Sequence, residues 1–210
     1  RQCRGLIVDG GRFPWAGDER YPMLSKPRPE YAGMVLSETF GNFGFAIACR
    51  VLGLRDLGPA LSPFNAFLIQ QGVETLSLRM ERHVDNALKV ATWLQDRPEV
   101  ADVRYSGLPS SPYHALQQKY SPRGAGSVFG FDLKGGREAG AAFIDHLTLF
   151  SNLANVGDVR SLAIHPATTT HSQGSDDDRR GAGVTPGLVR LSVGIENAND
   201  IIADLEKGFA

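Results

Sequence analysis

The sequence predicts an α/β protein whose C-terminal part is an α+β module of about a hundred residues. Three observations predict this fold class. An amphipathic pattern covers residues 72–96, segments with strand and helix periodicity alternate after it, and residues 12–45 are rich in Pro, Gly and aromatic residues. Helices beside a small sheet, joined by connections of mixed length, are typical of an α+β arrangement.

Composition limits the class of protein and its partners. The chain has 210 residues, of which 42% are hydrophobic and 21% charged, and its net charge is −1. This is enough chain for one large domain or two small ones, and no basic stripe indicates a nucleic acid or membrane partner. Cys3 and Cys49 have no metal-binding spacing and fit a reducing cytoplasm. No segment has the pattern of a signal peptide or a membrane span.

The first segments have two different patterns. Residues 5–11, GLIVDGG, predict a short buried strand followed by a glycine turn. Because domains rarely begin inside their core, we expect the chain to be a piece of a larger protein. Residues 12–45 predict a long, mostly irregular loop, and such loops usually cover a site or an interface.

Three helices are predicted next. Residues 46–57 form a short helix that ends near Gly58, and a second helix begins with Ser62 as its N-cap and Pro63 at its first position. The third and strongest covers residues 72–96, where His83 is expected to be partly exposed. Its apolar face contains Val73, Leu76, Met80, Val84, Ala87, Ala91 and Leu94.

The remaining elements alternate between strands and helices. Period-2 and buried patterns predict strands at residues 100–108, 126–133, 159–166 and 188–194. Period-3.6 patterns predict helices at residues 136–150 and 199–209, with Asn199 as the cap of the second.

Arg190 is the first candidate for a functional residue. In the strand 188–194, Val189, Leu191 and Val193 share one face, and Arg190 lies on the other. One interpretation is an arginine on the solvent face of a sheet. The other is a planar fork that holds a substrate carboxylate through two parallel hydrogen bonds.

Residues 151–173 gather the polar types that metal sites and hydrolases use, including Asn155, Asp158, His165 and His171. The two histidines lie across a Pro-containing loop, and no nucleophile-elbow glycine pattern is present. We therefore expect loop polar groups that bond to their own backbone. Residues 175–178, SDDD, predict the first turn of a helix.

Two long segments resemble a known family. Residues 156–173, VGDVRSLAIHPATTTHSQ, and residues 182–197, AGVTPGLVRLSVGIEN, resemble C-terminal signatures of the pyridoxal-phosphate enzymes of cysteine and methionine metabolism. Residues 6–11 and 38–83 also resemble this family, so the resemblance covers nearly the whole chain. It corresponds to roughly the C-terminal half of the family's chain.

The resemblance implies a fold-type-I, aminotransferase-like architecture. Residues 1–70 would complete the large cofactor-binding domain, residues 71–97 would form a long connecting helix, and residues 98–210 would form a C-terminal α/β domain. Arg190 matches the family arginine that binds the substrate α-carboxylate. Asn155 matches a small polar residue beside that carboxylate.

The chain departs from the family pattern in one respect. The family joins pyridoxal 5'-phosphate to a lysine within an S-x-[ST]-K segment, and this sequence contains no such segment. The family's cofactor-binding aspartate and glycines also precede the part that this chain resembles. The resemblance therefore implies that the chain contains no catalytic residue of its own and is inactive alone. Its expected partners are the N-terminal half of the same enzyme and further copies in a homotetramer.

The activity implied by the resemblance is that of an O-acetylhomoserine sulfhydrylase, favoured by residues 153–158, LANVGD. Such enzymes make homocysteine from the amino-acid substrate O-acetylhomoserine and sulfide by γ-replacement, a step of methionine biosynthesis. Two alternatives stay open. One is a sister enzyme, a cystathionine synthase or a sulfur amino-acid lyase, and the other is a non-catalytic half that only assembles with a full-length partner.

Overall fold

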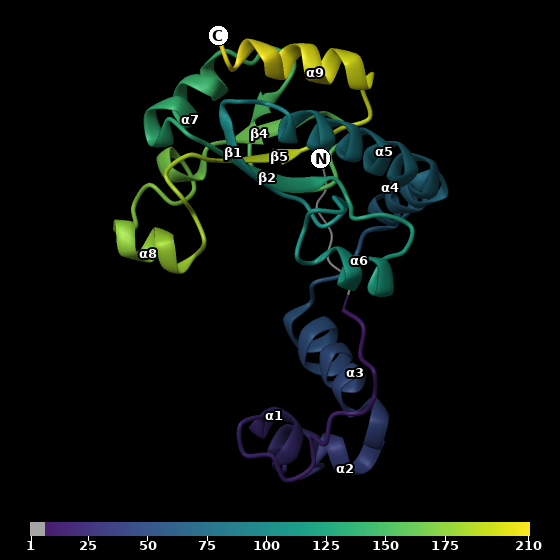
Figure 1. Ribbon diagram of the computed structural model, residues 1–210. Helices are drawn as coiled ribbons and strands as arrows, with labels where there is room; N and C mark the ends of the chain where they lie inside the picture. The colour runs from purple at the N-terminus through teal and green to yellow at the C-terminus, as the bar shows by residue number, and fades with distance from the viewer. Residues whose placement is uncertain (1–6) are drawn as a thin grey trace. The chain divides into compact units, whose positions relative to one another are not determined.

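The computed structural model describes residues 7–210, and the chain divides into two units, Arg1–Gly72 and Val73–Ala210 (Figure 1). Each unit is described by itself. Within the described residues, no helix is long and apolar enough to cross a membrane.

The first unit consists of short helices around a small aromatic core. Leu24, Leu36 and Ala48 are buried at its centre, and the Trp15 ring stacks on Phe45 at a centroid distance of 5.4 Å. Residues 12–45 thus contain more helix than the irregular loop that we expected, because the aromatic side chains provide a core for short helical turns. Up to residue 56, the helices of this unit are α1 (Pro22–Ser25), η1 (Pro29–Tyr31), α2 (Leu36–Phe40), η2 (Gly41–Phe43), α3 (Gly44–Ala48) and η3 (Cys49–Asp56).

The predicted buried strand at residues 5–11 is wrong for its described part. Residues 7–11 form no strand, and Ile7 and Val8 are 75% and 81% exposed. A strand needs a neighbour to bond its backbone groups, and no strand is present among the described residues of this unit. The glycine turn is confirmed, since the Gly11 amide donates to Asp9 Oδ1 at 3.0 Å and Gly11 has a φ of +63°. Residues 5 and 6 lie outside the described residues.

The next two helix predictions are confirmed. Helices α3 and η3, the latter a π-helix, cover most of residues 46–57, and the chain turns at Gly58 with a φ of +81°. Pro63 is the first residue of α4 (Pro63–Glu74), and the Asn65 amide donates to Ser62 Oγ at 3.2 Å.

The second unit is built on a five-stranded sheet with the order β1-β2-β5-β4-β3. Strand β3 pairs with β4 in parallel, and the other pairs are antiparallel. The predicted strands are confirmed, although they are shorter than their patterns. They correspond to β1 (Val100–Arg104), β2 (Val128–Leu133), β4 (Leu162–Ile164) and β5 (Leu188–Ser192). The short strand β3 (Ser151–Asn152), which pairs with β4, was not predicted.

Three helices cover one face of this sheet: α5 (Leu76–Gln95), α7 (Gly136–Asp145) and α9 (Ala198–Lys207) (Figure 1). Phe131 of β2, Phe143 of α7 and Leu205 of α9 are completely buried in the core between these layers. The remaining helices of the unit are α6 (His114–Tyr120), η4 (Pro166–Thr168) and α8 (Asp176–Gly181).

The predicted helix 72–96 is divided into two. Helix α4 ends at Glu74, the Thr75 backbone leaves the helical region, and α5 begins at Leu76. His83 is buried rather than partly exposed, at 2% exposure. Its Nδ1 lies 2.7 Å from the Val193 carbonyl, and this bond compensates for the burial of the ring.

Two further helix boundaries differ from the prediction. Helix α7 ends at Asp145, because the amides of Thr148, Leu149 and Phe150 bond to the Asp204 carboxylate instead of continuing the helix. The cap of α9 is Asn197 rather than Asn199, since its side chain accepts the Asn199 amide.

Candidate functional site

Arg190 lies at the centre of the second unit's sheet. Strand β5 has neighbours on both sides, and Arg190 pairs with Gly130 of β2 and with Ile164 of β4. Val189 and Leu191, on either side of it in the chain, are completely buried in the helix-covered face. Strand alternation therefore directs the Arg190 side chain to the opposite face, where it is partly buried.

The guanidinium of Arg190 has only one weak hydrogen-bond partner among the described residues. Its Nη2 donates to the Asn155 carbonyl at 3.5 Å. Within residues 7–210, no carboxylate forms an ion pair with it. A partly buried guanidinium that lacks a counter-charge is suited to bind an anion, and its planar fork matches a carboxylate.

The structure brings Asn155 next to Arg190, but through its backbone. The side-chain Oδ1 of Asn155 accepts the amide of Val156 at 2.9 Å. The carboxamide thus stabilises the local turn, while the carbonyl contacts the guanidinium.

A hydrogen-bond network that the sequence did not indicate surrounds the end of β5. The Glu196 carboxylate accepts the amide and the hydroxyl of Ser161 at 2.7 and 2.9 Å. On the other side, Asn86 Nδ2 of α5 donates to the carbonyls of Gly194 and Glu196 at 3.0 and 2.8 Å. Only the polarity of Glu196 and Asn197, next to a buried strand, could have indicated such bonds.

The polar residues of segment 151–173 bond to neighbouring protein groups. His165 is buried, with its ring nitrogens 2.9 Å from Thr168 Oγ1 and 2.8 Å from the Pro186 carbonyl. His171 is exposed and lies against Thr170. In the described part of the chain, no three residues of the metal-binding types come together. The expected bonds to the local backbone are present for Thr169, whose hydroxyl donates to the His165 carbonyl, but His165 Nε2 bonds to the Pro186 carbonyl 21 positions away.

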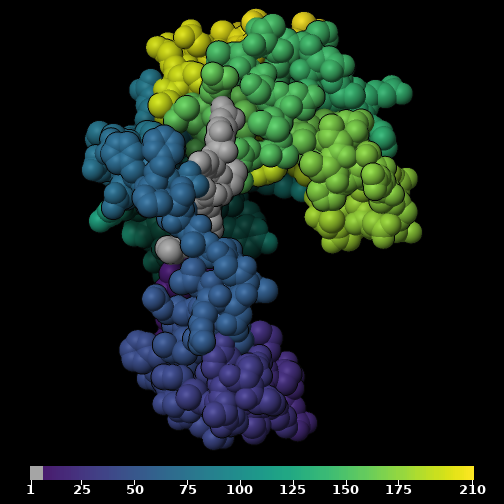
Figure 2. All heavy atoms as spheres, turned by 180° about the vertical axis from the view of Figure 1, so that it is seen from behind, coloured from purple at the N-terminus to yellow at the C-terminus, as the bar shows by residue number. Residues whose placement is uncertain are grey.

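The SDDD segment caps a helix, as predicted. The Asp178 amide donates to Ser175 Oγ at 3.1 Å, and Asp178 Oδ2 accepts the Ser175 amide at 2.9 Å. This reciprocal pair is a capping box that starts α8. The surrounding segment forms a lobe on the surface of the second unit, yellow-green in Figure 2.

The five lysines all have surface contacts. Three of them form ion pairs with acidic residues, one donates to a backbone carbonyl, and one lies over a tyrosine ring. A lysine that forms a Schiff base needs a low pKa, which burial or a neighbouring cation provides. All five are instead exposed: Lys26, Lys89, Lys119, Lys134 and Lys207.

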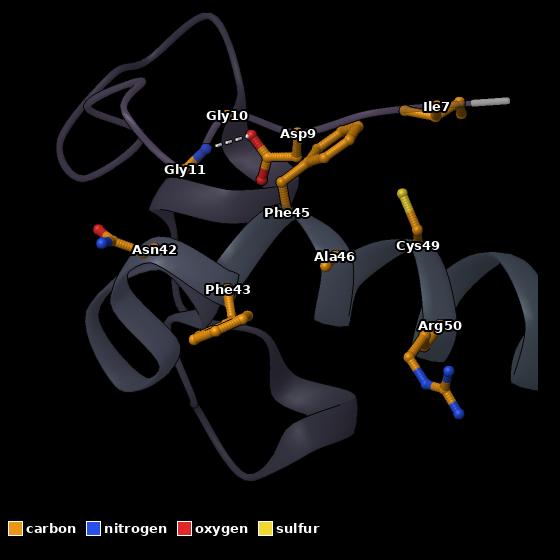
Figure 3. Close-up of a pocket in the computed structure, with 10 residues that line it drawn as sticks. All are labelled: Ile7, Asp9, Gly10, Gly11, Asn42, Phe43, Phe45, Ala46, Cys49 and Arg50. Atoms are coloured by element: carbon orange, nitrogen blue, oxygen red, sulfur yellow. Dashed lines mark hydrogen bonds between the residues drawn. The ribbon is translucent and has the colours of Figure 1, made fainter.

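The first unit carries a separate cavity of about 650 Å³. Figure 3 shows Ile7, Phe43 and Phe45 around it, with Cys49 and Arg50 on the helix that continues α3. The Phe45 ring lies beside Asp9, whose carboxylate is already bonded to Gly11. Among the described residues, the lining combines apolar side chains with Asp9, Asn42 and Arg50.

The class of this protein follows from the fold and from the sequence comparison. The sequence model of the family described as Cys/Met metabolism PLP-dependent enzyme matches residues 3–210. The chain belongs to this family.

Relatives and a solved structure agree with this assignment. The chain is 54% identical to O-acetyl-L-homoserine sulfhydrylase 1 of Thermus thermophilus and 53% identical to O-acetyl-L-homoserine sulfhydrylase of Leptospira meyeri. Both matches cover 98% of this chain, but 49% and 48% of those proteins. The chain therefore spans about half the length of these relatives.

A crystal structure from Campylobacter jejuni, described as an O-acetylhomoserine (thiol)-lyase, superimposes with a TM-score of 0.83 at 42% identity. The match covers 92% of this chain and 46% of the other, and that protein carries pyridoxyl-lysine monophosphate. The fold is thus that of a PLP-dependent enzyme of this type, as the sequence predicted.

Proposed function

We propose that this chain is the C-terminal portion of a PLP-dependent O-acetylhomoserine sulfhydrylase, in which Arg190 binds the α-carboxylate of the amino-acid substrate. The observation that carries this proposal is the partly buried guanidinium of Arg190 on the central strand β5. No carboxylate among residues 7–210 forms an ion pair with it. The names of the relatives support the choice of O-acetylhomoserine and sulfide as substrates.

The proposed role of Arg190 follows from its geometry. Two parallel N–H bonds from the guanidinium fix a carboxylate in one plane, whereas a lysine would bind it as a point charge. The hydrogen bond from Arg190 Nη2 to the Asn155 carbonyl is long, at 3.5 Å, so the N–H groups of the guanidinium remain available to a ligand. Fixing the carboxylate orients the bonds at the substrate's α-carbon, which is where positioning contributes to the rate.

Pyridoxal phosphate, when bound, supplies the electron sink of this chemistry. The residues of this chain do not fit its covalent attachment, because every lysine is exposed and in contact with a surface partner. We infer that the attachment lysine belongs to polypeptide outside this chain. The length of the relatives, about twice that of this chain, supports this inference.

The proposed partners are the N-terminal half of the same enzyme and further copies of it, in the cytoplasm. Exposed apolar side chains in the first unit and in α4 support an interface there, since Leu57, Phe43 and Phe64 are 81%, 71% and 67% exposed. Large exposed apolar patches mark interaction surfaces.

The test is an assay of the full-length protein that contains this sequence. Loaded with pyridoxal phosphate, it should form homocysteine and acetate from O-acetyl-L-homoserine and sulfide. Cystathionine formed from cysteine, without homocysteine from sulfide, would instead identify the sister enzyme. A loaded protein that consumes neither pair of substrates would contradict the proposal.

A further inference from the structure

We propose that Glu196 is a positioning residue for substrate binding. It would act through Ser161 by holding the loop 153–160, which presents the Asn155 carbonyl to Arg190. The inference rests on the proposed function for the role of Arg190. The geometry of the anchor itself is independent of that function.

The first step is the bond between Glu196 and the loop. The two carboxylate oxygens of Glu196 accept the Ser161 amide at 2.7 Å and its hydroxyl at 2.9 Å. Ser161 is completely buried, and its Oγ also accepts the Gly194 amide at 2.9 Å. One serine thus joins the end of the loop to the segment after β5 through three hydrogen bonds.

The second step is that Glu196 itself is held in place. Asn86, completely buried in α5, donates to the carbonyls of Gly194 and Glu196. His83 of the same helix lies 2.7 Å from the Val193 carbonyl. The segment 193–196 is therefore fixed to a long helix, so Glu196 is a rigid point from which the loop can be held.

The third step is the close approach of the two segments. The Ile195 amide donates to the Val159 carbonyl at 2.9 Å. A Cβ at Gly194 would lie 2.5 Å from the Val159 carbonyl oxygen and 2.2 Å from the Glu196 carboxylate. Real Cβ contacts of this length do not occur, so the approach requires glycine at position 194.

Glu196 and Ser161 each lie a few residues after one partner of the Arg190–Asn155 contact, the proposed substrate site. Arg190 precedes Glu196 on the same strand and its continuation, and Asn155 precedes Ser161 in the loop. Both partners of the Arg190–Asn155 contact are therefore tied to the Glu196–Ser161 anchor. Without this anchor, the Asn155 carbonyl should move and the Arg190 guanidinium should turn. Binding of the substrate carboxylate should then weaken more than the chemical steps that follow it.

The experiment uses the full-length enzyme loaded with pyridoxal phosphate and the variants Glu196→Ala, Glu196→Gln and Ser161→Ala. Glu206→Ala is the matched control, because Glu206 is an exposed glutamate of α9. Four quantities are measured: KM, kcat, the dissociation constant of L-norvaline from cofactor absorbance, and the rate of backbone hydrogen exchange of residues 153–160. L-Norvaline carries the α-carboxylate but no leaving group.

For Glu196→Ala we expect a rise of about tenfold in KM and in the L-norvaline dissociation constant, with kcat changed less than threefold. Exchange of residues 153–160 should accelerate while that of β2 stays the same. Glu196→Gln keeps an acceptor for the Ser161 amide, so its effect should be smaller. The Glu206→Ala control should match the parent.

Unchanged L-norvaline affinity in Glu196→Ala, with or without faster loop exchange, would overturn the inference. If Glu196→Ala does not fold, the isosteric Glu196→Gln and the single-atom deletion Ser161→Ala decide it by the same criteria. If the parent enzyme makes no homocysteine, the proposed reaction fails. The exchange and L-norvaline measurements still decide whether Glu196 positions the loop for carboxylate binding.

Discussion

A guanidinium on a central strand is costly to bury unless an anion compensates for it. Arg190 is partly buried, and within residues 7–210 its hydrogen-bond partner is the Asn155 carbonyl, at the limit of hydrogen-bond length. Other arginines of the second unit, such as Arg104 and Arg179, have carboxylate partners. This difference supports the proposal that Arg190 binds a ligand.

Replacing Arg190 should therefore reduce substrate use in the full-length enzyme. Arg190→Ala removes the partner of a desolvated carboxylate, which costs about 2–5 kcal/mol, so kcat/KM should fall by roughly two orders of magnitude or more. Arg190→Lys keeps the charge but loses the bidentate fork, and its loss should be smaller. Steady-state kinetics measured together with cofactor content provide the test.

Cofactor content should stay at the parent level in both Arg190 variants, because this guanidinium is proposed to bind only the amino acid. Arg123→Ala, at an exposed position outside the strands, is the control. If kcat/KM of Arg190→Ala stays within about threefold of the parent, a difference below about 1 kcal/mol, Arg190 is only a surface residue of the sheet.

Among the elements, the junction of α7 and α9 depends on one carboxylate. Asp204, 2% exposed, accepts the amides of residues 148–150 and bonds to Lys207 Nζ at 2.9 Å. Burial by itself would raise the pKa of Asp204. The hydrogen bonds from Lys207 and Thr148 outweigh this effect and lower the pKa to about 2.

This pKa predicts a pH-dependent contribution to stability. The folded pKa lies below the ordinary aspartate value of 3.8, so the stabilisation is present above about pH 4 and is lost as the pH falls toward about 2. A shift of this size corresponds to about 2 kcal/mol. Urea unfolding of the parent and of Asp204→Asn should differ by at least about that amount at pH 7.

The difference between the two proteins should shrink as the pH falls from 4 toward 2. Glu206→Gln, which removes an exposed carboxylate from the same helix, should unfold like the parent throughout. An Asp204→Asn variant that is as stable as the parent at pH 7 would show that the cluster does not hold α7 and α9 together.

Elements with local signals could be predicted from the sequence. The period-2 pattern of residues 126–133 predicted β2, and the period-3.6 pattern of residues 199–209 predicted α9. The apolar side chains of these patterns are buried: Phe129, Phe131, Leu133, Ile201 and Leu205. Period-2 alternation also placed Arg190 on the face opposite Val189 and Leu191, the placement on which the candidate site depends.

Features set by contacts between distant residues could not be predicted. Asp204 ends α7 from 54 to 56 positions away, and His83 bonds to a carbonyl 110 positions away. In the sequence each of these residues has only the polarity of an exposed helix position. The extended segment at Ile7 and Val8 had a strand pattern, but strand formation depends on a neighbouring strand that no local pattern can indicate.

At the scale of the whole molecule, the lysines predict how this chain behaves toward the cofactor. We expect the 210-residue chain alone to form no Schiff base with pyridoxal phosphate at a unique position, because all five lysines are exposed. Borohydride reduction followed by peptide mapping should show weak labelling spread over several lysines. A single lysine labelled stoichiometrically would contradict this expectation, and the full-length protein is the positive control.

The exposed apolar surface leads to a second expectation for the whole molecule, that the chain alone associates. In α4, Phe64 and Phe67 are 67% and 54% exposed, and Ile7 and Val8 near the start of the first unit are more exposed than either. Removing such area from water contributes roughly 25 cal/mol per Å². The chain should therefore sediment as oligomers at micromolar concentration, and it should be shifted to a defined complex by the N-terminal half of the enzyme.

The double variant Phe64→Ser/Phe67→Ser should weaken self-association without changing the circular dichroism, because neither ring is part of the buried cores. Leu116→Ser, which removes an apolar side chain that is 51% exposed in α6, is the control and should associate like the parent. The two variants distinguish association through the α4 surface from non-specific association through any exposed apolar side chain. Only association through α4 should weaken when the two phenylalanines are replaced. A parent chain that sediments as a stable monomer over the whole concentration range would show that these apolar side chains do not form an interface.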